Sequence, residues 1–236
     1  MPTEKTVACG IDVMKKGLLK QAIIKYVSGV ILIGILVFLP AWDLRWKNGW
    51  ILMAVLFVPM FFAGMVMYAK APDLLRSRLN AKETQSEQKD VIRYSGLMFL
   101  AAFIIAGLDY RFVWTKVPEA VMWAATAVFL LAYCMFGEVL RENQYLSRTI
   151  EVQEDQTVVD TGLYGIVRHP MYTATVFLFL SMPLILGSLP SFIIMLVYIP
   201  IIVKRIGNEE TVLEAELKGY AEYRKKVKYR LIPLIW

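Results

Sequence analysis

Histidine and cysteine are scarce in this sequence, with one His and two Cys among 236 residues. A zinc site needs three or four nitrogen or sulfur ligands, so we expect no metal site. Cys9 lies in a polar stretch and Cys134 in an apolar one, which gives no sign of a disulfide framework. Charged residues are also sparse, at 19% of the chain against about a quarter in soluble domains. The composition therefore argues against a metalloprotein, a disulfide-stabilised domain and an ordinary soluble domain.

Apolar residues are abundant instead, at 58% of the chain, and the mean hydropathy is +0.53. They gather in six segments, and a membrane-spanning helix needs about 20 mostly apolar residues. The last two segments are short, and their prolines and the Gly187-Ser188 turn predict a kinked hairpin. We therefore predict an all-α fold, an integral membrane helical bundle with about six transmembrane helices, in segments 23–40, 50–69, 94–108, 120–137, 172–186 and 189–203.

Lysine and arginine are unevenly distributed around these segments. Alternate connections, starting with the N-terminal one, hold 22 basic residues, and the other connections hold 4. Cytoplasmic loops of membrane proteins carry the excess of Lys and Arg. We therefore predict a multi-pass protein with both termini and the 138–171 connection in the cytoplasm. Because the basic residues lie between apolar segments, they are explained by topology, and we expect no nucleic-acid partner.

Two connections are too long to be simple turns. Residues 70–93 are polar and charged, which predicts a surface helix and a loop. Residues 138–171 mix charges with apolar pairs and end in a Gly-rich turn, and long ordered loops are often functional. We therefore divide the chain into N-terminal transmembrane helices, 1–140, and a C-terminal core, 141–236, that carries the chemistry.

The only histidine lies in the stretch 162–172, which reads GLYGIVRHPMY. Pro170 fits the first turn of a helix, so we predict His169 at a helix N-terminus, where free N–H groups suit an anionic ligand. The alternative is an interfacial cluster, in which Arg168 faces phospholipid and the two tyrosines form part of an aromatic belt.

A second group of charges follows the last apolar segment. In a helix, Arg205 and Glu209 lie one turn apart on the apolar side, whereas Glu210 and Glu214 turn toward water. An ordinary surface ion pair is the alternative, although charges aimed at an apolar interior are costly unless they are used. The basic tail, 219–230, predicts a C-terminal amphipathic helix that lies on anionic membrane lipids.

Several motifs occur in a fixed order between Asn143 and the C-terminus. After Asn143 they are Val152-Gln153, VVDTGLY at 158–164, RHPMY at 168–172, Arg205 with Glu209-Glu210, and GYAEY at 219–223. In this order the set resembles the isoprenylcysteine carboxyl methyltransferase family and, more broadly, the phospholipid methyltransferase-like membrane enzymes. The matching stretch covers roughly 40% of the chain, and residues 1–140 add no family signal.

The family's methyl donor is S-adenosyl-L-methionine, so the resemblance implies a cytoplasmic site for this cofactor. It implies that Arg205 orients the carboxylate of the acceptor and that Glu209 faces the cationic part of the donor. These two are the candidate catalytic residues, and Arg205 is also the candidate substrate-binding residue. The implied cofactor-binding residues are Gln153, Gln156, Thr157, Val158, Val159, Tyr164, His169, Pro170, Met171, Tyr172 and Glu209.

The resemblance also implies a lipid-like or prenylated acceptor within the membrane, with isoprenylcysteine-type O-methylation of a carboxylate as the first candidate. A carboxylate is already a nucleophile at neutral pH. A phospholipid-type amine would first lose a proton, and Glu210 would then be the base candidate. Two other classes stay open, a nicotinamide-dependent reductase of the sterol-reductase type and a non-enzymatic membrane protein such as a transporter or scaffold.

Overall fold

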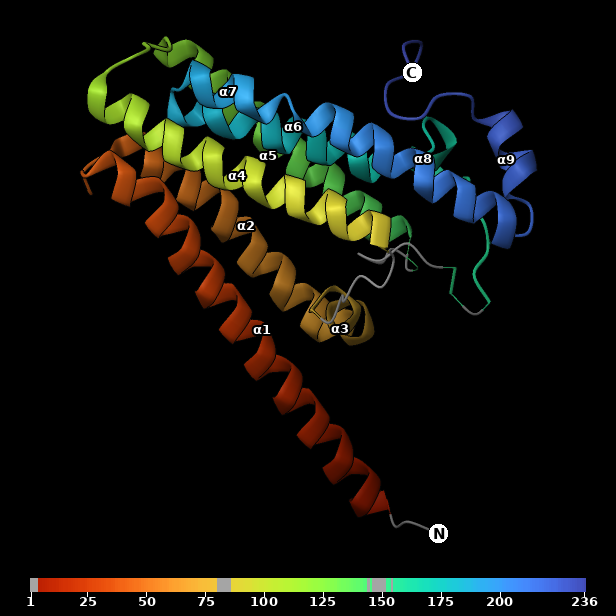
Figure 1. Cartoon of the computed structure of the whole chain (residues 1–236). Coiled ribbons are helices and arrows are strands. Elements are labelled where there is room, and N and C mark those ends of the chain that lie inside the picture. Colours follow the sequence, from red (N-terminus) through yellow and green to blue (C-terminus); the bar gives the residue numbers. More distant parts are fainter. Residues whose placement is uncertain (1–3, 80–85, 144, 146–151, 154) are drawn as a thin grey trace.

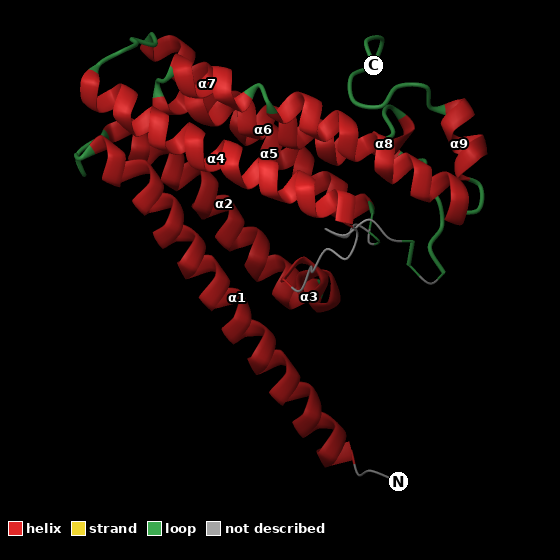
Figure 2. Cartoon of the chain, viewed as in Figure 1, coloured by secondary structure: helices red, strands yellow, loops and turns green. Residues whose placement is uncertain are grey.

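The computed structural model describes residues 4–79, 86–143, 145, 152–153 and 155–236. Within these ranges the regular secondary structure is entirely helical (Figure 2). The elements, in chain order, are α1 (Glu4–Ala41), α2 (Lys47–Lys70), α3 (Pro72–Leu79), α4 (Ser86–Phe112), α5 (Glu119–Glu142), the 3-10 turn η1 (Gly162–Gly165), α6 (Pro170–Leu186), α7 (Leu189–Met195), α8 (Tyr198–Glu216) and α9 (Tyr220–Lys226).

Five helical segments are long and apolar enough to cross a membrane, and α6 is apolar but shorter. This finding confirms the all-α, multi-pass fold. Of the two segments predicted to be short, α6 is short, and the last one is longer than predicted because it continues to Glu216. The five are Gly17–Ala41 in α1, Lys47–Lys70, Val91–Phe112 in α4, Glu119–Glu142, and Leu189–Glu216, which includes α7 and α8. The predicted surface helix in 70–93 is α3.

The span in α4 continues beyond the predicted segment 94–108, past two charged residues. Asp109 is only 2% exposed, and its two carboxylate oxygens accept hydrogen bonds from the backbone N of Thr115 at 2.7 Å and from its hydroxyl at 2.6 Å. A buried carboxylate with such partners costs much less than an unpaired one. The helix therefore extends to Phe112.

The predicted hairpin lies between α6 and α7. Gly187 ends α6 in the left-handed region, at φ 80°, and the Ser188 hydroxyl caps α7 by accepting from Ser191 N at 3.3 Å. The chain leaves regular α-helix again at residues 196–197. Pro200 explains this break, because it has no N–H to donate to the carbonyl of Leu196.

The helices form a bundle with two different ends (Figure 1). The turn end gathers the α1–α2, α4–α5 and α6–α7 connections, where the Tyr110 hydroxyl donates to Asp43 at 2.9 Å. The other end, which we call the pocket end, gathers α3, residues 155–169, the C-terminal half of α8, and α9 with the tail after it. The basic residues of α3 and of the segment after α8 therefore lie at the pocket end, whereas the N-terminal part of α1 extends away from the bundle.

The predicted amphipathic helix of the tail is the seven-residue α9. Tyr220, Tyr223 and Val227 are buried in a small core with Leu217, so the apolar face of this helix packs on protein. Its basic residues are exposed. Contact of this basic face with membrane lipids stays a prediction.

Candidate active site

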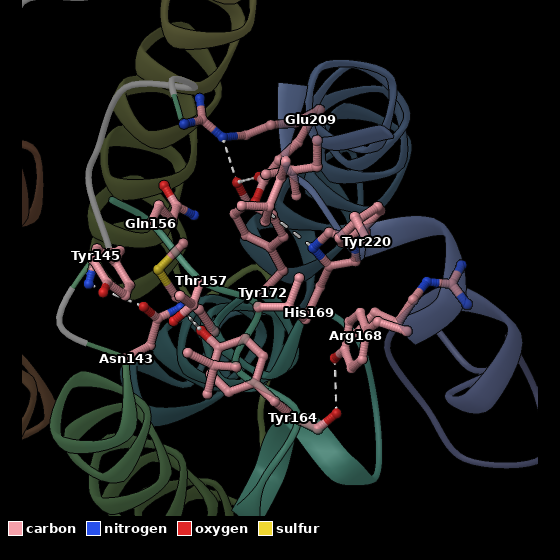
Figure 3. Close-up of a pocket in the computed structure, with 17 residues that line it drawn as sticks. Asn143, Tyr145, Gln156, Thr157, Tyr164, Arg168, His169, Tyr172, Glu209 and Tyr220 are labelled. Atoms are coloured by element: carbon pink, nitrogen blue, oxygen red, sulfur yellow. Dashed lines mark hydrogen bonds and ion pairs between the residues drawn. The ribbon is translucent and has the colours of Figure 1, made fainter. Parts of the chain in front are cut away.

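A pocket opens at the pocket end, between residues 156–159, η1, the start of α6 and α8 (Figure 3). Aromatic and aliphatic side chains form much of its wall, and polar groups are interspersed among them. It is lined by Asn143, Tyr145, Gln156, Thr157, Val158, Val159, Tyr164, Arg168, His169, Met171, Tyr172, Arg205, Glu209, Leu213, Leu217, Tyr220 and Tyr223.

Most residues predicted for the site line this one pocket, although they come from three separate parts of the chain. Gln153 and Pro170 do not line it. Gln153 instead supports the loop, because its backbone N donates to the Gln156 side chain at 2.9 Å and its own amide donates to Tyr145 O at 2.8 Å. Pro170 is buried as the first residue of α6.

The turn at Gly162 brings the loop against the end of α5. Gly162 has φ 51°, and a Cβ there would lie 1.5 Å from Glu142 Oε1, so only glycine fits. The next backbone N, of Leu163, donates to Glu142 Oε2 at 3.0 Å. Tyr164 is thereby placed in the pocket wall, where its hydroxyl accepts from Asn143 at 3.1 Å. Burial raises the pKa of Tyr164 more than this hydrogen bond lowers it, so the phenol stays neutral.

The start of α6 is bonded to the C-terminal tail. The backbone N of Arg168 donates to Tyr229 O, and that of His169 to Arg230 O, each at 2.9 Å. The backbone N–H groups of Tyr172 and Thr173 donate to His169 O. These four N–H groups therefore have protein acceptors, which leaves fewer donors for an anionic ligand than the helix-terminus argument predicts.

Arg168 and Glu210 are both buried, and two expectations about them are wrong. Arg168 does not face phospholipid: its Nε donates to Glu210 Oε1 at 2.8 Å, and its Nη1 donates to Val227 O and Lys228 O. Glu210 does not turn toward water, because it is 3% exposed. The physical reason is the tail, which folds back over α8 and supplies partners that helix periodicity cannot predict.

Glu210 is saturated with hydrogen bonds. Its Oε1 accepts from Arg168 and lies 3.1 Å from His169 Nε2, and its Oε2 lies 2.9 Å and 2.8 Å from two nitrogens of Arg230. A buried carboxylate with two guanidinium partners remains ionised. Glu210 does not line the pocket, so its role is to join α8, the start of α6 and the tail.

Glu209, the next residue, takes part in a different set of contacts. The Tyr172 hydroxyl donates to Glu209 Oε2 and accepts from Arg205 Nε, the latter at 3.0 Å (Figure 3). The Arg205 guanidinium also lies over the Tyr172 ring, 5.9 Å from its centroid. Arg205 and Glu209 therefore share one face of α8, as predicted, and Tyr172 connects them across the pocket.

Some pocket residues were not assigned a role from sequence, namely Tyr145, Arg168, Leu213, Leu217, Tyr220 and Tyr223. The GYAEY motif could have indicated Tyr220 and Tyr223, since tyrosines three residues apart share a helix face. The other four residues reach the pocket wall only through the packing of the loop and the tail, which the sequence does not predict. No cluster of three potential metal ligands occurs among the described residues.

Residues 122–215 match the model of the isoprenylcysteine carboxyl methyltransferase (ICMT) family. The match confirms the resemblance drawn from the motifs, and it runs from α5 to near the end of α8. It supports methyl transfer by a membrane protein, because the ICMT segment contains the RHPMY motif, Arg205 and Glu209. No curated protein matches the chain significantly.

Proposed function

We propose that this protein transfers a methyl group from S-adenosyl-L-methionine to the carboxylate of a lipid-like acceptor in the membrane, as in isoprenylcysteine-type O-methylation. The observation that carries the proposal is the Arg205–Tyr172–Glu209 contact chain. It presents a guanidinium and a carboxylate in one pocket, within the segment that matches the ICMT family.

The pocket suits the donor, which supplies an activated methyl group on a sulfonium cation. Among the described lining residues Glu209 is the only carboxylate, and it can balance that positive charge. The aliphatic and aromatic wall, with Val158, Val159 and Tyr145, offers apolar contact to an adenine, and Gln156 and Thr157 offer hydrogen bonds to a ribose.

The acceptor side is assigned to Arg205. It lies one turn before Glu209 on α8 and is therefore closer to the apolar part of the span, from which a lipid-like acceptor would approach. A guanidinium can hold a carboxylate with two parallel hydrogen bonds, which orients the attacking oxygen. Alignment of oxygen and methyl carbon with water excluded is the main requirement of this reaction, because no proton has to be removed.

The contacts of Glu210 favour a carboxylate acceptor over an amine. An amine would need a base, and Glu210 is occupied by Arg168, His169 and Arg230 and lies outside the pocket. Glu209, which already accepts the Tyr172 hydroxyl, would be the remaining candidate. Phospholipid-type N-methylation is therefore the less favoured function.

The decisive experiment incubates the purified protein with methyl-labelled S-adenosyl-L-methionine and a native lipid extract. A labelled product that releases its methyl group in mild base is a carboxyl ester and supports the proposal. A base-stable product would indicate an N-methyltransferase. No transfer, together with binding of NADPH, would favour a reductase instead.

The proposal also puts the pocket at the cytoplasmic face, with both termini on that side. It is supported by the 22 to 4 distribution of basic residues and by the position of α3, α9 and the tail at the pocket end. Reporter fusions at each terminus should be active only in the cytoplasm, and activity outside would overturn this orientation.

A further inference from the structure

One wall of the pocket is formed by His169, Glu209 and Tyr220, and the ligand group assigned to it below rests on the proposed function. Figure 3 shows the three residues close together, with Tyr172 to the left of His169 and Tyr220. Among the described residues, each carries a polar atom that has no partner or a distant one.

The two nitrogens of His169 have different surroundings. Nε2 lies 3.1 Å from Glu210 Oε1, and an ionised carboxylate only accepts, so Nε2 carries a hydrogen and donates. Nδ1 faces Glu209 Oε1 at 3.9 Å. In a neutral imidazole one nitrogen carries the hydrogen and the other a lone pair, so with the hydrogen on Nε2 the Nδ1 atom is an acceptor.

His169 Nδ1 and Glu209 Oε1 are therefore two acceptors that face each other across a gap. Both belong to pocket-lining residues. The other oxygen of Glu209 is already engaged by Tyr172, so Oε1 is the one available to a ligand. Two acceptors at this distance can share one donor group placed between them, and a cationic donor is favoured because one acceptor is charged.

The Tyr220 hydroxyl is a third polar group of this wall. Tyr220 is 3% exposed, it lines the pocket, and its hydroxyl has no hydrogen-bond partner among the described residues. A buried hydroxyl without a partner costs free energy, so it indicates a ligand that completes it. Burial raises the pKa of Tyr220, and the nearby Glu210 carboxylate acts in the same direction, so the phenol stays neutral.

We infer that His169 Nδ1, Glu209 and the Tyr220 hydroxyl together bind the ammonium group of the methyl donor's amino-acid end. An ammonium has three N–H donors, which matches three acceptors. The same geometry turns the lone pair of His169 toward the pocket, where it would repel a carboxylate. His169 thus recognises the amino group of the donor, and not its carboxylate as the helix-terminus argument suggests.

The test compares two ligands that differ only in this group. One is S-adenosylhomocysteine, and the other is its deamino analogue, 3-carboxypropyl thioadenosine. Calorimetry on wild type should give an affinity for the first that is greater by about tenfold or more, as expected for a lost charge-assisted hydrogen bond. Tyr220→Phe should lower the affinity for S-adenosylhomocysteine by about tenfold and leave that for the deamino analogue unchanged.

Tyr198→Phe is the matched control. Tyr198 is another buried tyrosine, but its hydroxyl is paired with Thr175 at 2.9 Å and it lies outside the pocket lining. This variant should bind both ligands as wild type does. Thermal unfolding of Tyr220→Phe should occur at a temperature no lower than that of wild type, since the lost hydroxyl has no hydrogen-bond partner among the described residues.

Two outcomes would overturn the inference. Equal losses for the two ligands would mean that Tyr220 does not face the amino group, and no loss for either would mean that it binds no part of the donor. Failure of the proposed function looks different, because wild type itself would then bind neither ligand.

Discussion

The two sides of the C-terminal half of α8 differ in what their charges do. On the pocket side, the Tyr172 hydroxyl joins Arg205 to one oxygen of Glu209, and the other oxygen lies 3.9 Å from His169 Nδ1. On the tail side, Glu210 is 3% exposed and both of its oxygens are engaged by the protein. Adjacent carboxylates can therefore have unrelated roles, since successive residues point about 100° apart around a helix.

Glu210 and Glu209 differ in whether contacts within the protein occupy both carboxylate oxygens, and this difference separates a structural charge from a functional one. A fully paired buried carboxylate stabilises the fold and has no capacity left for a substrate. A partly paired carboxylate in a pocket is costly without a ligand and is useful with one. The two sides of α8 should therefore respond oppositely to substitution.

The largest effect is expected on the tail side. Glu210→Ala removes the common partner of Arg168 and Arg230, and Arg168 stays buried with an unpaired charge. We expect the free energy of unfolding to fall by about 3–5 kcal/mol, measured by thermal unfolding in detergent. Glu209→Gln is the matched variant on the pocket side, and it should keep most stability while losing donor affinity. Equal destabilisation by both variants would remove the distinction between the two sides.

The next effect is expected for Arg205→Lys on the pocket side. Lysine keeps the charge but cannot form the planar pair of hydrogen bonds to a carboxylate. We expect the methyl-transfer rate to fall by about a hundredfold, about 2.7 kcal/mol, with near-normal binding of S-adenosylhomocysteine. Arg111→Lys, at the turn end, is the control and should leave the rate unchanged. If Arg205→Lys were silent in both assays, Arg205 would only anchor the span at lipid head groups.

A smaller loss of stability is expected on the tail side when Arg230, the more exposed partner of Glu210, is replaced. Arg230→Ala frees Glu210 Oε2, while Oε1 keeps Arg168 and His169. The Arg230 side chain is 30% exposed, so water can replace part of the contact. We expect a loss of about 1–2 kcal/mol in unfolding free energy, well below that for Glu210→Ala. The exposed Lys225→Ala is the control, and an equal loss there would point to a general effect of charge.

The smallest effect is expected for the exposed ion pair between Lys226 and Asp160, which links α9 to the loop at 2.7 Å. The hydrogen bond from Lys226 lowers the pKa of Asp160 below its ordinary 3.8. Its stabilisation is therefore present above about pH 4 and is lost as the pH falls through the lowered value. Lys226→Met should lower the unfolding temperature slightly at pH 7 and by less at pH 3. An undiminished difference at pH 3 and in high salt would exclude an electrostatic origin.

Much of the site follows from local rules. Helix periodicity places Arg205 and Glu209 on one face, and Pro170 at the start of α6 puts His169 before it. Four-residue and three-residue spacings hold in any helix, so these statements do not depend on the rest of the chain. The same rules give the wrong surroundings for Glu210 and Arg168. They assume that a side chain outside the apolar face is in contact with water or lipid, whereas here the C-terminal tail covers both side chains.

The sequence by itself determines the membrane spans, the asymmetry of basic residues and the order of the motifs. These properties depend on composition and on short spacings along the chain. Only the tertiary structure decides that the tail folds over α8, saturates Glu210 and directs Arg168 inward. It also decides that Tyr220 is buried in the pocket wall without a hydrogen-bond partner among the described residues. The physical reason is that these contacts join residues tens of positions apart, and their strength depends on burial, which no local pattern encodes.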